Sequence, residues 1–191
     1  MKIQLKILFA VLLLFIVGCD IFEVRDPENP TDTRSGYRVP FEPNVVIENL
    51  ITAFQERNAN DYKKNFAEGP PIVDRVFYFV PSGNVVSSFP SEWFINDEFQ
   101  YFNNLISRTQ QDVPMNLSFN GDQFDRQGDS AIFSAGYSIS VPVQNANPQI
   151  YEGSLKFTMI IDNNSTWVIY LWEDIALPEK NSWSELKVEF Y

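Results

Sequence analysis

Residues 130–143 read SAIFSAGYSISVPV, an alternation of apolar residues with small polar residues. Every odd position is apolar, and serine or glycine occupies positions 134, 136, 138 and 140. Successive side chains of an extended strand point to opposite faces, so this segment has one apolar face and one polar face. The pattern predicts a strand that packs one face against a core.

The same alternation continues after this segment. Apolar residues occupy most odd positions of 151–161 and 167–171, and the polar connections 145–149 and 162–165 are typical of hairpins. Consecutive strands joined by short turns indicate an antiparallel sheet. An earlier strand is expected at 115–124, turning either at Arg126–Asp129 or at Asn120-Gly121.

Helical spacing comes before these strands. Apolar residues from Val46 to Phe54 recur every three to four positions, which predicts an amphipathic helix over 44–57 entered through Pro43. Gly69-Pro70-Pro71 stops helical structure. Helices followed by long antiparallel strands indicate one α+β domain over 44–191. Within it we also expect a short helical turn near 60–66, a strand at 73–80 and a helix within 89–108.

Composition excludes several classes of function. The chain has 25 acidic and 14 basic residues, and this balance disfavours binding to nucleic acid. It contains no histidine, the commonest general base and zinc ligand, and no dinucleotide or phosphate-binding glycine motif. We therefore expect neither a metal ion nor a cofactor. Its 17 Phe, 8 Tyr and 4 Trp residues suffice for a large core.

The N-terminus has the features of a signal peptide. Lys2 and Lys6 precede an apolar run, Ile7 to Val17, that spans only roughly 16 Å as a helix and is too short for a bilayer. The run ends in Ile16-Val17-Gly18-Cys19, which resembles the bacterial lipobox. The resemblance implies cleavage after residue 18 and a diacylglycerol thioether on Cys19, the only cysteine.

Residues 19–43 differ in composition from the domain. They hold four prolines among polar residues with no periodicity, which indicates a tether between the lipidated cysteine and the domain. We expect a lipid-anchored protein of the cell envelope. Asp20 would retain it in the inner membrane under the enteric sorting rule, but other lineages do not follow that rule, and we favour the outer membrane.

The order of elements resembles nuclear-transport-factor-2-like proteins. The resemblance rests on the order of elements: a leading amphipathic helix, a short helix starting near Asn60-Asp61-Tyr62, one strand, another helix carrying Trp93 and Glu98, and long strands that end in Trp172-Glu173-Asp174. It implies a cystatin-like roll, a cone-shaped curved antiparallel sheet wrapped around N-terminal helices. The family includes isomerases, dehydratases, polyketide cyclases and non-catalytic binding modules, so the fold alone assigns no reaction. The terminal segment Ser182–Lys187 resembles the tail of secreted members.

Seven residues are candidates for a pocket inside this cone. Trp93, Phe94, Tyr101 and Trp172 either line a cavity for an apolar ligand or fill the cone as core. A carboxyl group in such an interior has a raised pKa, as a base near neutrality requires. The candidates for a carboxylate–phenol site are Asp174, Tyr78 and Tyr137, although no catalytic motif aligns with them and we assign no catalytic residue. Asp97 and Glu98 suit the first turn of a helix and need no further role.

Three hypotheses follow. The first is an envelope lipoprotein whose domain binds a small apolar ligand or a protein partner without catalysis. The second is a histidine-free isomerase, dehydratase or cyclase that uses the Asp/Tyr pair. A hollow cone with an acid at its floor favours the second, and a cone filled by its own aromatic residues with no buried acid favours the first. The third is homodimerisation through the outer sheet face, suggested by Val168, Tyr170 and Trp172.

Overall fold

The computed structural model describes residues 35–83, 85–143 and 146–191. The predicted signal peptide 1–18, the candidate lipidation site Cys19 and the tether as far as Arg34 lie outside the described residues. Within the described part, no helix is long and apolar enough to cross a bilayer.

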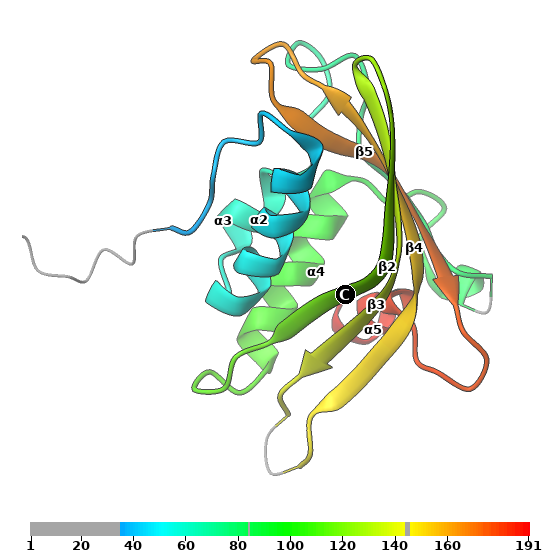
Figure 1. Cartoon of the computed structure of the whole chain (residues 1–191). Coiled ribbons are helices and arrows are strands. Elements are labelled where there is room, and N and C mark those ends of the chain that lie inside the picture. The colour runs from blue at the N-terminus through cyan, green and yellow to red at the C-terminus, as the bar shows by residue number, and fades with distance from the viewer. Residues whose placement is uncertain (1–34, 84, 144–145) are drawn as a thin grey trace, which may run out of the picture. The chain divides into compact units, whose positions relative to one another are not determined.

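The framework of the domain is a curved, open sheet of five strands in the order β1-β5-β4-β3-β2. Neighbouring strands are antiparallel except β1, which runs parallel to β5. Helices lie on the concave face (Figure 1), and this arrangement confirms the predicted α+β class with a sheet curved around helices. The strands are β1 (Tyr78–Val80), β2 (Asn116–Gln127), β3 (Ser130–Val141), β4 (Gln149–Ile161) and β5 (Trp167–Ala176).

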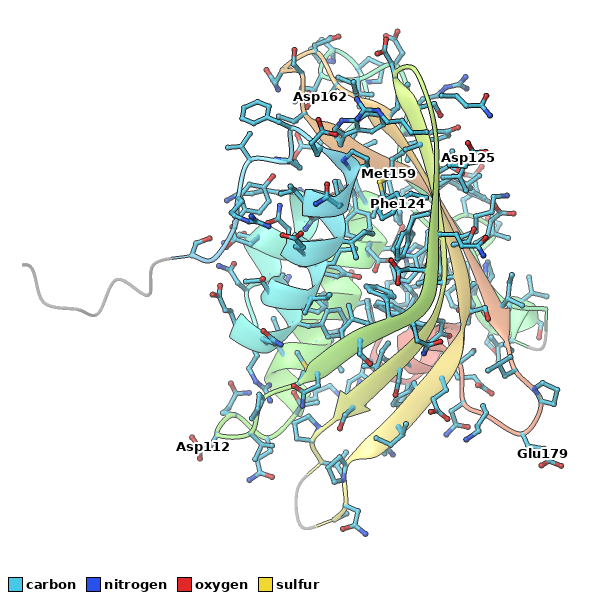
Figure 2. All side chains as sticks on the ribbon, in the orientation of Figure 1. Asp112, Phe124, Asp125, Met159, Asp162 and Glu179 are labelled. Carbon is cyan, nitrogen blue, oxygen red and sulfur yellow. The ribbon has the colours of Figure 1, made fainter. Side chains whose placement is uncertain are left out.

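Strand β3 has the orientation that its alternation predicts. Its odd residues are buried and its even residues are partly exposed along the whole strand. On β4, Met159 points toward the helices, whereas Asp125 of β2 lies on the other side of the sheet (Figure 2). The turn before β3 lies at Gly128-Asp129, because pairing continues to Gln127 and Ser130. The other candidate turn, Asn120-Gly121, is a bulge within β2.

A register shift in β5 changes which of its residues face inward. Before the shift, Trp167 and Ile169 face the concave side of the sheet. After the shift, Trp172 and Asp174 face that side. Trp172 is fully buried. The prediction that Val168, Tyr170 and Trp172 form one outer apolar stripe is therefore wrong, because the bulge breaks the two-residue period on which it rested.

Three helices cover the concave face: α2 (Pro43–Glu56), α3 (Ala59–Lys63) and α4 (Ile95–Arg108). Pro43 occupies the first turn of α2, and Asn58 caps α3 by accepting a hydrogen bond from the Asp61 N–H at 3.1 Å. Helix α4 begins at Ile95, so Trp93, which was predicted on this helix, precedes it; the extended N-cap Phe94 donates through its N–H to Asp97 Oδ2 at 2.9 Å, which fixes the start of the helix. Only the end of the predicted strand 73–80 is strand, as β1.

Residues 35–42, which belong to the predicted tether, form hydrogen bonds with the domain. The Arg38 N–H donates to Asn49 Oδ1 at 3.0 Å, and Asn49 Nδ2 donates back to the Arg38 carbonyl at 2.7 Å. The Trp167 N–H donates to the carbonyl of the buried Pro40 at 2.8 Å. These residues are thus part of the compact unit that starts at Ser35.

A fourth helix, α5 (Trp183–Phe190), follows β5 and has no counterpart among the predicted elements. The loop after β5, with Glu179 at its tip (Figure 2), leads the chain back toward the sheet. Ser182 caps α5: its side chain accepts from the Glu185 N–H at 3.3 Å, and the Glu185 carboxylate accepts from the Ser182 N–H. The position of α5 determines what the interior of the cone contains.

Candidate functional site

Helix α5 supplies much of the interior of the cone. Trp183, Leu186, Lys187 and Phe190 are all buried, none more than 4% exposed. The Trp183 ring packs edge-on against Trp172 at 4.5 Å between centroids and against Phe54 at 5.5 Å. The domain's last helix thus packs against α4, β4 and β5 and projects Trp183 between the sheet and α2.

A fully buried ion pair lies at the centre of this interior. Lys187 of α5 donates through Nζ to Glu98 Oε2, and the two side chains are 0% and 1% exposed. The same carboxylate accepts from the Tyr62 hydroxyl at 2.6 Å and from Trp93 Nε1 at 2.7 Å. Three donors from three segments therefore converge on Glu98, as the burial of a charged carboxylate requires.

Aromatic rings surround the ammonium group of Lys187. Its Nζ atom lies 3.9 Å from the ring centroid of Trp172, 4.2 Å from that of Phe79, 4.9 Å from that of Tyr101 and 5.5 Å from that of Trp93. Each distance lies within cation–π range. Burial lowers the pKa of Lys187 to about 8, although the Glu98 carboxylate opposes this shift. We call Glu98 and these four rings the cation box.

A second buried acid, Asp174, lies at the inner end of β5. Its Oδ1 accepts from the Tyr137 hydroxyl at 2.7 Å, and its Oδ2 accepts from the Ser184 N–H at 2.8 Å and from the Ser184 hydroxyl. The Tyr137 oxygen accepts in turn from the Trp183 N–H at 2.6 Å. Burial raises the pKa of Asp174, and the Ser184 and Tyr137 hydrogen bonds partly counteract that shift. Burial also raises the pKa of Tyr137.

The structure places the seven sequence-predicted residues in two groups. Five lie together in the interior: Trp93, Tyr101, Tyr137, Trp172 and Asp174. Tyr78 and Phe94 lie outside it. Tyr78 alternates with the buried Phe79 on β1, so its side chain faces outward, 36% exposed, and packs near Phe94.

Sequence reasoning missed the charged half of the site. Glu98 was assigned no role beyond the first helical turn, yet it is the carboxylate of the ion pair. Lys187, Ser184 and Tyr62 were not candidates at all. A signal was present for α5, because Ser182 and Glu185 have the spacing of a capping box.

Neither of two surface hollows lined by described residues includes any of the seven candidates. One, of about 220 Å³, lies beside Tyr37, Phe66 and Thr166, and the other beside residues 176–181. Across residues 35–83, 85–143 and 146–191, no group of three His, Cys, Asp or Glu side chains is placed to hold a metal ion.

Comparison with known proteins identifies the fold. The sequence matches no family model and no curated protein. A nuclear-transport-factor-2-like superfamily protein from Salmonella enterica superimposes with a TM-score of 0.52 over 70% of this chain and 88% of its own, at 12% identity. The domain has the nuclear-transport-factor-2-like fold. The resemblance predicted from the order of elements is thereby confirmed.

Two further structures with this nuclear-transport-factor-2-like architecture have different descriptions. A candidate dehydratase of the family from Streptomyces avermitilis has a TM-score of 0.55 and 9% identity, over 70% of this chain and 92% of its own. A candidate calcium/calmodulin-dependent protein kinase II association domain from Xanthomonas campestris has a TM-score of 0.54 and 13% identity, over 74% and 94%. At these identities the likeness concerns the fold, and a fold hosts many functions.

Proposed function

We propose that this protein is a lipid-anchored envelope lipoprotein whose nuclear-transport-factor-2-like domain is a binding module, not an enzyme. One observation carries the proposal for the domain: α5 occupies the interior with Trp183, Leu186 and Lys187. A catalytic base must reach the proton that it abstracts. Here both carboxylate oxygens of Glu98 and of Asp174 already accept hydrogen bonds from the protein's own donors.

The domain shows one feature expected of a binding module, a filled cone, and one expected of an enzyme, a buried acid. The interior is filled by the protein's own aromatic side chains, which favours binding. Two buried acids are present as well, which is a feature expected of an enzyme. We weight the filled interior more, because both acids are held by contacts to α5 that a substrate would first have to break.

A specific geometry supports a second candidate, an isomerase, dehydratase or cyclase. The Tyr137 hydroxyl lies 2.7 Å from Asp174 Oδ1, and the raised pKa of this carboxyl suits a base near neutrality. Such an enzyme would act only with α5 displaced, because Ser184 and Trp183 bind the same two groups.

Proton exchange distinguishes the two candidates. The full chain, purified in a non-ionic detergent, would be incubated with a panel of apolar cyclic ketones in D₂O, and α-proton exchange followed by NMR. We expect no exchange above the buffer rate, in wild type or in Asp174→Asn. Exchange catalysed by wild type and lost in Asp174→Asn would establish the enzyme and overturn the binding role.

The anchor is supported by the lipobox-like Ile16-Val17-Gly18-Cys19. A thiol at Cys19 is required for the thioether, so Cys19→Ser should abolish the diacylglycerol mass increment. Asp20→Ser is the matched control, because it changes the next residue and leaves the thiol. A wild-type protein that lacks the diacylglycerol increment, or a Cys19→Ser protein that still carries it, would contradict the anchor.

A further inference from the structure

The cation box has the composition of a receptor for an organic cation. A carboxylate closes one end, and the rings of Phe79, Trp93, Tyr101 and Trp172 surround the charge. Aromatic cages of this kind bind ammonium groups in proteins. A buried ion pair is weak evidence of stabilisation, because apolar residues of similar volume often fill the same space at lower cost. The arrangement therefore calls for an explanation other than packing.

All of the box except its occupant comes from elements other than α5. Glu98 and Tyr101 belong to α4, Phe79 to β1 and Trp172 to β5, while Trp93 precedes α4. Only the ammonium group, on Lys187, comes from α5, the last element of the chain. Receptor and occupant are thus separate in the sequence and joined by the exposed residues 177–181.

A second observation in the box points to a ligand. The indole N–H of Trp172, in a side chain that is fully buried, has no acceptor among the described residues. Buried indole N–H groups usually find a partner, and an unsatisfied one costs free energy. When Lys187 occupies the cation box, its ammonium group therefore has Glu98 as an acceptor, but the Trp172 N–H has no acceptor among the described residues.

We propose that the interior of the cone is a binding site for a small alkylammonium ion and that α5 closes it by inserting Lys187 as an internal substitute. This inference rests on the proposed binding role and deepens it by naming the class of ligand. The ligand's ammonium group replaces that of Lys187 against Glu98. A ligand that carries an acceptor atom in addition to its ammonium group would also satisfy the Trp172 indole.

The proposal makes binding depend on how firmly α5 is docked. A ligand that binds only the open state has an apparent affinity reduced by the fraction of molecules that are open. A variant that weakens docking without touching the box should therefore bind more tightly. Phe190 is suitable, because it is not a member of the box, and its buried ring at the C-terminal end of α5 contacts the Arg108 guanidinium. Val188, exposed on the same helix, provides the matched control.

The test uses the full chain in a non-ionic detergent and n-butylammonium as the probe, with tryptophan fluorescence as the readout. We expect Phe190→Ala to bind the probe about ten-fold more tightly than wild type and Val188→Ala to bind like wild type. Amide hydrogen exchange in α5 should accelerate as the probe saturates, while exchange in β3 stays slow. Equal affinities in all three proteins, or no saturable binding, would overturn the proposal.

A cavity variant keeps the proposal testable if Phe190→Ala does not fold. Lys187→Ala leaves the box without its cation, and n-butylammonium should raise its thermal midpoint saturably whereas n-butanol of the same size should not. Equal stabilisation by butanol would show a merely apolar cavity, and stabilisation by neither would likewise refute the assignment. These failures differ from failure of the proposed function, which would appear as ketone proton exchange dependent on Asp174.

Discussion

Asp97 and Glu98 are neighbours in the first turn of α4, yet their surroundings differ completely. Asp97 is near the surface and accepts from the Phe94 N–H and the Tyr191 hydroxyl. Glu98 is turned inward by the roughly 100° that separates consecutive helical residues, and meets Lys187. One step in the sequence therefore separates a helix-capping carboxylate from the centre of the site.

Neutralising Glu98 should destabilise the domain strongly. Glu98→Gln leaves the Lys187 ammonium buried without its counter-charge, and breaking a buried pair in this way costs about 3–5 kcal/mol. Urea unfolding measures the change. Lys180→Gln is the control, because it removes an exposed ion pair with Glu152 and should leave the free energy of unfolding nearly unchanged. Equal effects of the two substitutions would contradict the burial of Glu98.

The low pKa of Lys187 predicts a rise of stability with pH. The folded domain releases this proton near pH 8, whereas the unfolded chain keeps it to about pH 10.4. The unfolded state therefore binds more protons in this window, and the free energy of unfolding should increase with pH by up to about 1.4 kcal/mol per unit. The free-energy penalty of burying the charged Lys187 ammonium is fully present below pH 8. It decreases as the pH rises above 8, because the folded domain releases this proton.

Urea unfolding between about pH 7.5 and 9.5 checks this slope. The double variant Glu98→Gln/Lys187→Met, which lacks both charges, should show no such rise. The window closes near pH 10, because the raised pKa values of the buried Tyr62 and Tyr101 make stability fall once unfolded tyrosines ionise. A wild-type stability that falls between pH 8 and 9.5 relative to the double variant would refute the assignment.

Strand β4 has a glycine, Gly153, where the Tyr137 side chain crosses it to reach Asp174. Gly153 lies opposite Tyr137 in the β3–β4 register, and a Cβ atom there would lie 2.3 Å from the Tyr137 hydroxyl oxygen. Gly153→Ala should therefore displace the phenol from Asp174 and cost about 1–3 kcal/mol. Gly83→Ala, with nothing within 4 Å of its Cβ, should be nearly neutral. Thermal unfolding of the two variants measures the difference. Equal midpoints would contradict the close approach of Gly153 to the Tyr137 hydroxyl.

Elements with a long apolar period could be predicted from the sequence, and those defined by a short segment or an irregularity could not. The alternation of β3 continues over the whole strand, so it fixed both the strand and its buried face. The bulge in β5 leaves no mark in the apolar pattern, and Trp172 was consequently assigned to two faces at once. Helix α5 has only eight residues, too few for a clear period, so its capping box was the one usable signal.

For the candidate site, sequence reasoning recovered the apolar and acidic parts but not the cation. Trp93, Tyr101 and Trp172 stood out as aromatic residues, and Asp174 as an acid at a strand end. Lys187 carries no such signal, because a lysine is ordinarily exposed. Only the packing of α5 reveals that this side chain is buried.

At the scale of the whole molecule, the domain combines a common fold with an interior filled from its own C-terminus. The sheet and first helices build the cone, and α5 fills it with an ion pair and aromatic contacts. Under the proposed function, the anchor holds this closed module at a membrane. Both the proposed binding role and the proposed ligand site require α5 to be docked with Lys187 in the cation box.

NMR of the full chain in detergent micelles tests whether α5 is docked with Lys187 in the cation box. With ¹³C,¹⁵N-labelled lysine, and Lys187→Met to assign the signal, the Lys187 ε-methylene protons should show ring-current shifts and nuclear Overhauser contacts to the Trp93 and Trp172 rings. A Lys187 signal at the position of an exposed lysine, without contacts to either indole, would show that α5 is not docked and would contradict the account.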